Sequence, residues 1–148
     1  MDRHHLPSAI VAVSLLVLCG AASTASAKTE IAGAAILDHP CGKVSVQQMG
    51  LIHAGKFDEA NRLTTTQMQD QWKAMSAKDR EMMAGMAKDM SQSPEEFASD
   101  VKANGQLVVD GQDAKLTVQT KHQDANGSST STMTQTFKVD GAHCLVSR

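Results

Sequence analysis

The hydrophobic pattern of this 148-residue chain changes its period at Gly105. Before that glycine, apolar residues recur at the spacing of one helical face, as Met68, Trp72 and Met75 do. After it, apolar and polar residues alternate, as over Leu116–Thr120, which is the period of a strand with one buried face. Helices grouped before strands predict an α+β domain in which a helical layer covers one face of a sheet.

Glycine-containing pairs divide the C-terminal part of the chain into strands. The breaks are Asp110-Gly111, Asn126-Gly127 and Asp140-Gly141, pairs that favour hairpin turns, and no segment between them is long enough for a crossover helix. The sequence therefore predicts a four-stranded antiparallel meander, with strands over Gln106–Asp110, Ala114–His122, Ser129–Val139 and Ala142–Ser147.

Glycine, proline and serine mark the ends of the predicted helices. A helix over Val44–Ala54 is expected to end at Gly55, and the next begins at Phe57 with acidic residues in its first turn. Ser76 and Ser93 are predicted N-caps, and a proline and a glutamate follow Ser93 as in a capping box. Residues 28–43 are predicted to form a lead-in arm, loosely ordered or a short strand, ahead of a single domain over residues 44–148.

The first 27 residues have the organisation of a secretory signal peptide. An apolar run over Ile10–Leu18 precedes a small-x-small site, so cleavage is predicted between Ala27 and Lys28. That run is shorter than the about 20 residues that span a bilayer, and no membrane span is expected after the signal is removed. Lipidation at Cys19 and retention as an anchor are the alternatives. The mature protein is therefore expected to be periplasmic or secreted.

Two cysteines, Cys41 and Cys144, follow the predicted cleavage site. A disulfide persists in an oxidising compartment, and the absence of a C-x-x-C motif favours a structural bond over a redox or metal centre. The bond would close a loop of about 100 residues, worth up to about 4.7 kcal/mol in the chain-entropy model. We therefore predict a Cys41–Cys144 disulfide, with reactive or metal-binding thiols as the alternative.

Charge and aromatic content narrow the classes of function. The net charge is −2 and no basic block occurs, so neither nucleic acid nor anionic lipid is an expected partner. Tyrosine is absent and Trp72 is the one tryptophan, so stacking on bases or sugars is not an expected mode of binding. The chain also lacks a G-x-S-x-G motif and a glycine-rich phosphate loop, so no cofactor is expected.

Histidines and aspartates are scattered along the sequence. The four histidines after the predicted cleavage site form no H-x-x-x-H pair, so no zinc site or catalytic histidine is predicted; they are His39, His53, His122 and His143. Aspartates near predicted helix starts or on polar faces are interpreted as capping or solvated groups: Asp38, Asp58, Asp70 and Asp79. Threonines on one predicted strand are interpreted as a solvated face: Thr130, Thr132, Thr134 and Thr136.

Methionines are concentrated between Ser76 and Ser93. Met83, Met86 and Met90 share one face of the predicted helix, and the interpretation is core or pocket lining, because Met fills irregular gaps well. The alternative is a metal site, since thioether and imidazole ligands suit Cu(I) and His53 or His122 could lie nearby. Exposure of this face would distinguish the two.

Two short segments carry a resemblance to a known family. Leu51–Ala60 is similar to a "helix, G-D-Y/F-x-x-A, helix" opening, and Phe137–His143 resembles a closing V-D-G-x-W hairpin, with His143 where an aromatic is common. Both resemble the NTF2-like superfamily, in particular its small exported bacterial proteins of the DUF4878 or lumazine-binding-like kind. In order of elements the resemblance covers Val44 to Arg148. It implies an NTF2-like/cystatin-like cone of curved sheet around helices, with a pocket at the open end; a homodimer formed through the sheets is an open alternative.

The resemblance and the missing catalytic motifs predict an exported binding or accessory protein rather than an enzyme. A small apolar ligand or a protein segment would occupy the cone. The expected lining residues are Trp72, Met83, Met86, Phe97, Leu116, Val118, Met133 and Phe137. The alternatives are a periplasmic inhibitor or immunity protein against a secreted toxin, an NTF2-like enzyme with a pocket carboxylate or histidine, and copper handling by the methionines.

Overall fold

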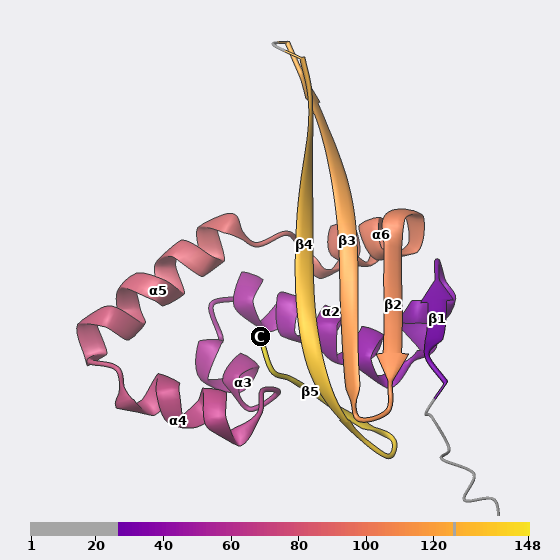
Figure 1. Cartoon of the computed structure of the whole chain (residues 1–148). Coiled ribbons are helices and arrows are strands. Elements are labelled where there is room, and N and C mark those ends of the chain that lie inside the picture. Colours follow the sequence, from indigo (N-terminus) through magenta and orange to yellow (C-terminus); the bar gives the residue numbers. More distant parts are fainter. Residues whose placement is uncertain (1–26, 126) are drawn as a thin grey trace, which may run out of the picture.

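Within residues 27–125 and 127–148, the computed structural model contains six helices and a five-stranded sheet (Figure 1). These are the residues that the structure describes. The predicted signal peptide, apart from Ala27, lies outside them, as do Cys19 and Asn126. Helices come before four of the five strands along the chain, which confirms the α+β class.

The sheet is antiparallel, and its strands lie side by side in chain order. They are β1 (Thr29–Ala32), β2 (Gly105–Asp110), β3 (Asp113–Asp124), β4 (Gly127–Asp140) and β5 (His143–Val146). The prediction of four strands is corrected to five, because part of the lead-in arm is a strand. Ile31 in β1 lies opposite Leu107 in β2. In the sequence, all six helices lie between these two strands.

Glycines form the two turns at one end of the meander, as their sequence pairs predicted. Asp110 lies opposite Asp113, and Asp140 lies opposite His143, so each hairpin has a two-residue loop. Gly111 and Gly141 have φ angles of 60° and 57° at the first loop position, a conformation that L side chains rarely adopt.

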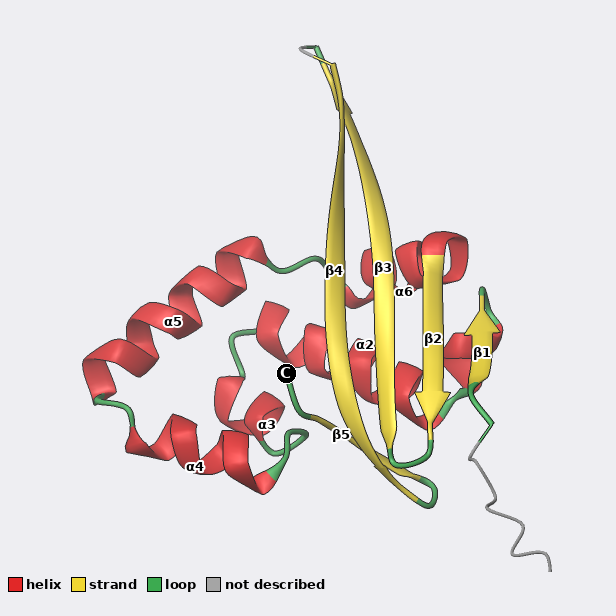
Figure 2. Cartoon of the chain, in the orientation of Figure 1, coloured by secondary structure: helices red, strands yellow, loops and turns green. Residues whose placement is uncertain are grey.

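The helices form two groups (Figure 2). The group that covers the sheet comprises α1 (Ala35–Asp38), α2 (Pro40–His53) and α6 (Pro94–Asn104). The group beside the sheet comprises α3 (Phe57–Asn61), α4 (Thr66–Ala74) and α5 (Ala77–Met90). Neither α4 nor α5 has a fully buried residue, so these two helices contribute little to the core.

Helix starts follow local chemistry with one departure. Ser93 accepts a hydrogen bond from the Glu96 N–H while the Glu96 carboxylate accepts one from the Ser93 N–H, which is the predicted capping box. The Ser76 side chain caps α5 by accepting a hydrogen bond from the Asp79 N–H. The first long helix begins at Pro40 rather than Val44, because His39 serves as its N-cap.

The core lies between the sheet and the helices that cover it. Phe97 and Val101 of α6 and Ile36 of α1 pack against inward-facing residues of the strands. All of these side chains are at most 4% exposed, and the strand contribution consists of Leu107, Ala114, Leu116, Val118, Phe137, Cys144 and Val146.

The β3–β4 hairpin is longer than the other strand pairs and extends beyond the helices (Figure 1). Its pairing continues from Gln119↔Thr132 to Asp124↔Gly127. Thr130, Thr132 and Thr134 are exposed, which confirms the solvated face for those three. Thr136 is half-buried instead, with its hydroxyl 3.0 Å from that of Ser147.

Candidate functional site: a groove along β5

The residues predicted to line a pocket inside the cone do not meet around a cavity. Four of them are core side chains at most 2% exposed: Phe97, Leu116, Val118 and Phe137. Met133 is half-buried against this core. Alternation identified the inward face of the sheet correctly, but α2 and α6 fill the space above it. The predicted internal pocket is therefore corrected to a packed interior.

The three helix residues in that prediction lie elsewhere. Met83 and Met86 are on α5 and are exposed, so the interpretation of the methionine face as core lining is corrected. Trp72 on α4 is half-buried and donates from Nε1 to Asp58 Oδ1 at 3.3 Å. It lines shallow hollows beside α3, and not the sheet interior.

A groove of about 870 Å³ runs along β5 and is larger than the hollows that Trp72 lines. Its walls come from the start of α2, from Leu63 and from β5 with the turn before it. The apolar lining consists of Pro40, Val44, Leu63, Ala142, Cys144 and Leu145, and the charged or polar rim consists of Lys43, Lys138, Asp140 and His143. Sequence analysis missed this groove because its lining comes from three separate segments.

The edge of β5 in this groove carries main-chain groups that face away from the sheet. The Val146 N–H donates to the Leu63 carbonyl, and the Val146 carbonyl accepts from the Thr65 N–H, so both groups of Val146 point away from β4. Successive residues of an antiparallel strand alternate in this respect, and Cys144 therefore also points its N–H and C=O outward. Among the residues that the structure describes, neither group of Cys144 has a partner.

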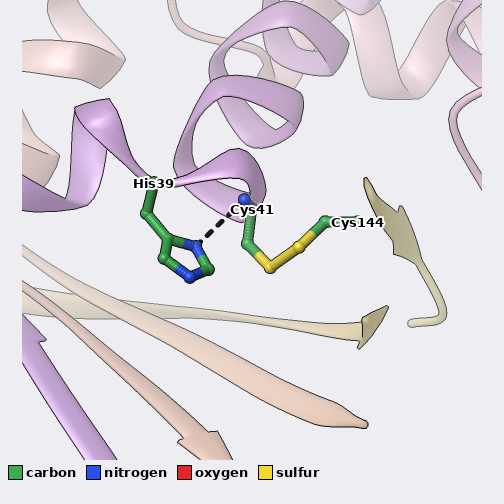
Figure 3. A group of neighbouring side chains, drawn as sticks. All are labelled: His39, Cys41 and Cys144. Atoms are coloured by element: carbon green, nitrogen blue, oxygen red, sulfur yellow. Dashed lines mark hydrogen bonds between the residues drawn. A yellow bond between two sulfur atoms is a disulfide. The ribbon is translucent and has the colours of Figure 1, made fainter. Parts of the chain in front are cut away.

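The disulfide fixes the wall of the groove. Cys41, at the start of α2, bonds to Cys144 in β5 with their Cα atoms 5.0 Å apart and 103 residues apart in sequence (Figure 3). The predicted disulfide is thus present. Both cysteines are buried, so the bond holds the helix start against the edge strand.

His39 stands beside this bond as the N-cap of α2. Its Nδ1 accepts a hydrogen bond from the Cys41 N–H at 3.2 Å (Figure 3), and burial lowers the pKa of its imidazole. A ring nitrogen of His39 and the two sulfurs lie within 4.8 Å of one another. As a disulfide the sulfurs offer no thiolate to a metal, and this cluster acts as a helix cap and a covalent tie.

A polar network lies under the sheet face and joins α2 to β4. Ser45 Oγ donates to Gln135 Oε1, and Gln135 Nε2 donates to Gln48 Oε1 at 2.6 Å. Ser45 and Gln48 are both buried, so Gln135 satisfies polar groups that would otherwise be costly in the interior. Sequence analysis missed Gln135, although its inward position between Met133 and Phe137 was a usable signal.

Where their side chains are described, the remaining histidines do not gather into one site. His53 ends α2, with Nδ1 3.3 Å from Ser91 Oγ, and His143 lies on the rim of the groove. The side chain of His122 lies outside the described part of the chain.

The aspartates singled out in the sequence are also separate from one another. Asp79 accepts from the Ser76 hydroxyl at 2.6 Å, as expected of a capping residue. Asp70 lies 3.8 Å from Lys73, Asp58 accepts from Trp72, and Asp38 is exposed on α1. These positions agree with capping and solvation.

Comparisons of the chain with protein-family models, with curated proteins and with solved structures found no match. Among the described residues, no helix combines the length and the apolar character that crossing a membrane requires. The NTF2-like resemblance therefore stays a prediction, and the groove is the structural feature that bears on function.

Proposed function

We propose that this chain is an exported, non-catalytic binding protein that takes an extended apolar segment of a partner protein into the groove along β5. The observation that carries the proposal is the outward-facing N–H and C=O of Cys144 between apolar walls. The disulfide supports export, because such bonds persist in oxidising compartments. The helical layer on one face of an antiparallel sheet supports an NTF2-like or cystatin-like architecture.

A protein segment suits this groove better than a small apolar ligand. An added strand obtains affinity from main-chain hydrogen bonds to a sheet edge and specificity from pockets for its alternate side chains. Cys144, although buried, supplies the first, since its N–H and C=O point away from β4 and have no partner among the described residues. Val44, Leu63 and Leu145 supply the second, as apolar side chains on either side of the edge.

The rim of the groove indicates what would flank the apolar residues of such a segment. Lys43 is exposed and belongs to no ion pair among the described residues. Lys138, by contrast, forms an ion pair with Asp113. A carboxylate near the apolar part of the incoming segment would therefore pair with Lys43.

Selection of binding peptides tests the proposal. A random peptide library would be panned on the disulfide-bonded protein, and enriched peptides would be followed by amide NMR. We expect apolar, acidic peptides that shift the amide signals of Cys144 and Leu145. Leu145→Glu should weaken their binding at least about tenfold, because it places a charge at a side chain that is 40% exposed on the wall.

Met90→Glu is the matched control, since it puts the same charge on an exposed apolar position of another element. It should leave peptide affinity unchanged. Failure to enrich any peptide, or enriched peptides whose shifts map away from β5, would contradict the proposal.

An inhibitor or immunity protein is the second candidate, and the projecting β3–β4 hairpin favours it. A hairpin that stands clear of the helices presents two strands to an enzyme cleft. Given a toxin from a neighbouring gene, a variant with a shortened hairpin would lose the complex while Leu145→Glu would retain it. The opposite pattern would favour the groove.

A further inference from the structure

The methionines of α5 form an exposed stripe. Met82, Met83, Met86 and Met90 are 57%, 48%, 58% and 82% exposed. At 3.6 residues per turn they fall within an arc of about 100° on the helix. Ala84 and the C-cap Ser91 lie about 130–150° around the helix from the middle of the stripe. Both are half-buried, and Ser91 contacts His53 of α2. Within the described part of the chain, the four methionine side chains are therefore largely accessible to solvent.

The stripe on α5 differs from an ordinary apolar helix face in its sulfur content. Every apolar side chain of α5 larger than alanine is methionine. The buried core of the same chain draws on Leu, Ile, Val and Phe, so the apolar composition of this face differs from that of the core. Sulfur is the atom that the four side chains share, and thioethers are soft ligands that select Cu(I).

We propose that the methionine stripe binds a soft monovalent cation, Cu(I) or Ag(I), through its thioethers. Met86 is the central ligand, because Met82 and Met90 lie four residues away on either side and Met83 lies three residues away. Side chains at these spacings are neighbours on a helix surface. Methionine is flexible enough for three sulfurs to turn toward one ion.

An imidazole lies near the end of α5, but on the side away from the stripe. His53 Nδ1 lies 3.3 Å from Ser91 Oγ, and Ser91 is half-buried on the side that contacts α2. The proposed site therefore consists of thioethers alone.

Methyl NMR with Ag(I) is the first test, because Ag(I) is not oxidised and needs no reductant. In protein carrying ¹³C-labelled methionine methyl groups, the signals of the four α5 methionines should shift and saturate at one ion per chain. Those of Met49 and Met133, which pack against the core, should stay in place. Cu(I) affinity would then be measured without oxygen by competition with a chromophoric chelator.

Leucine variants separate thioether ligation from apolar docking. Met86→Leu should lower Cu(I) and Ag(I) affinity at least about tenfold, while Met49→Leu, the matched control on α2, leaves it unchanged. Leu keeps the volume and helix propensity, so circular dichroism should show an unchanged fold. His53→Ala and Leu145→Glu should not affect Cu(I) binding, since His53 contacts α5 away from the stripe and the groove is a separate site.

Two results would overturn the proposal. One is a parent protein that binds Ag(I) no more tightly than free methionine does. The other is a variant with all four methionines replaced by leucine that retains the parent affinity. If such a variant also keeps a protein partner or self-association that the parent has, the stripe is a docking face instead.

Discussion

At the scale of single residues, the structure separates two glycines that the sequence presents alike. Gly42 and Gly85 both lie inside helices of fourteen residues. A Cβ on Gly42 would overlap the main-chain carbonyl of Ile36, whereas one on Gly85 would have no atom within 4 Å. Gly42 is therefore required for the close approach of α1 to α2, and Gly85 is not required by packing.

Alanine at the two positions should change stability in opposite directions. Gly42→Ala should lower the free energy of unfolding by about 3 kcal/mol or more, because the backbone of α1 has to move. Gly85→Ala should raise it by about 0.5–1 kcal/mol, the difference in helix propensity. Urea denaturation of both variants measures this. Equal and small effects would show that α1 does not pack on α2 as described.

At the scale of elements, α2 begins with an unusual cap. His39 uses a neutral ring nitrogen to accept the Cys41 N–H, where Ser, Thr, Asp or Asn is usual. Protonation of that nitrogen removes the acceptor. Burial also disfavours the charged ring, which is why the pKa of His39 lies below its ordinary value.

Stability should therefore depend on pH through this cap. In the unfolded chain His39 takes up its proton near its ordinary pKa of about 6.5, and in the folded protein only at lower pH. The stabilisation is present above pH 6.5 and is lost as the pH falls toward the lowered pKa. His39→Asn keeps a capping oxygen without the titration. Urea midpoints from pH 7.5 to 5 should fall more steeply for the parent than for this variant; parallel curves would contradict the assignment.

At the scale of the whole molecule, the disulfide ties the helical layer to the last strand. It closes a loop that contains every helix from α3 onward and three strands of the sheet. The bond lowers the conformational entropy of the unfolded chain. The unfolded state is thereby destabilised, and the free energy of unfolding rises.

Replacing both cysteines by alanine should lower the free energy of unfolding by about 2–5 kcal/mol. The affinity for the selected peptides should also fall, because the start of α2 and β5 form walls of the groove. Ag(I) binding to α5 should persist where the variant is folded. The contact of α5 with α2 is at His53, the end of α2 that is remote from Cys41. Reduction of the parent provides the control. Identical denaturation curves for the oxidised and reduced protein would show that the bond adds no stability.

Several features could be predicted from sequence because neighbouring residues decide them. Alternation and the glycine turns placed β2, β3, β4 and β5, and Ser93 with Glu96 placed the start of α6. Pairing of Cys41 with Cys144 followed from their number and the predicted export. Each of these depends on backbone geometry over a few residues or on a simple count, so no tertiary information was needed.

Tertiary structure alone decided the rest, because burial depends on residues far away in the chain. Spacing put Met83, Met86 and Met90 on one helical face, but only the position of α2 shows that this face points outward. Thr29–Ala32 became a strand because β2 offered a free edge. The interior that was expected to hold a ligand is filled by α2 and α6, and the binding surface moved to the edge of β5, where three separate segments meet.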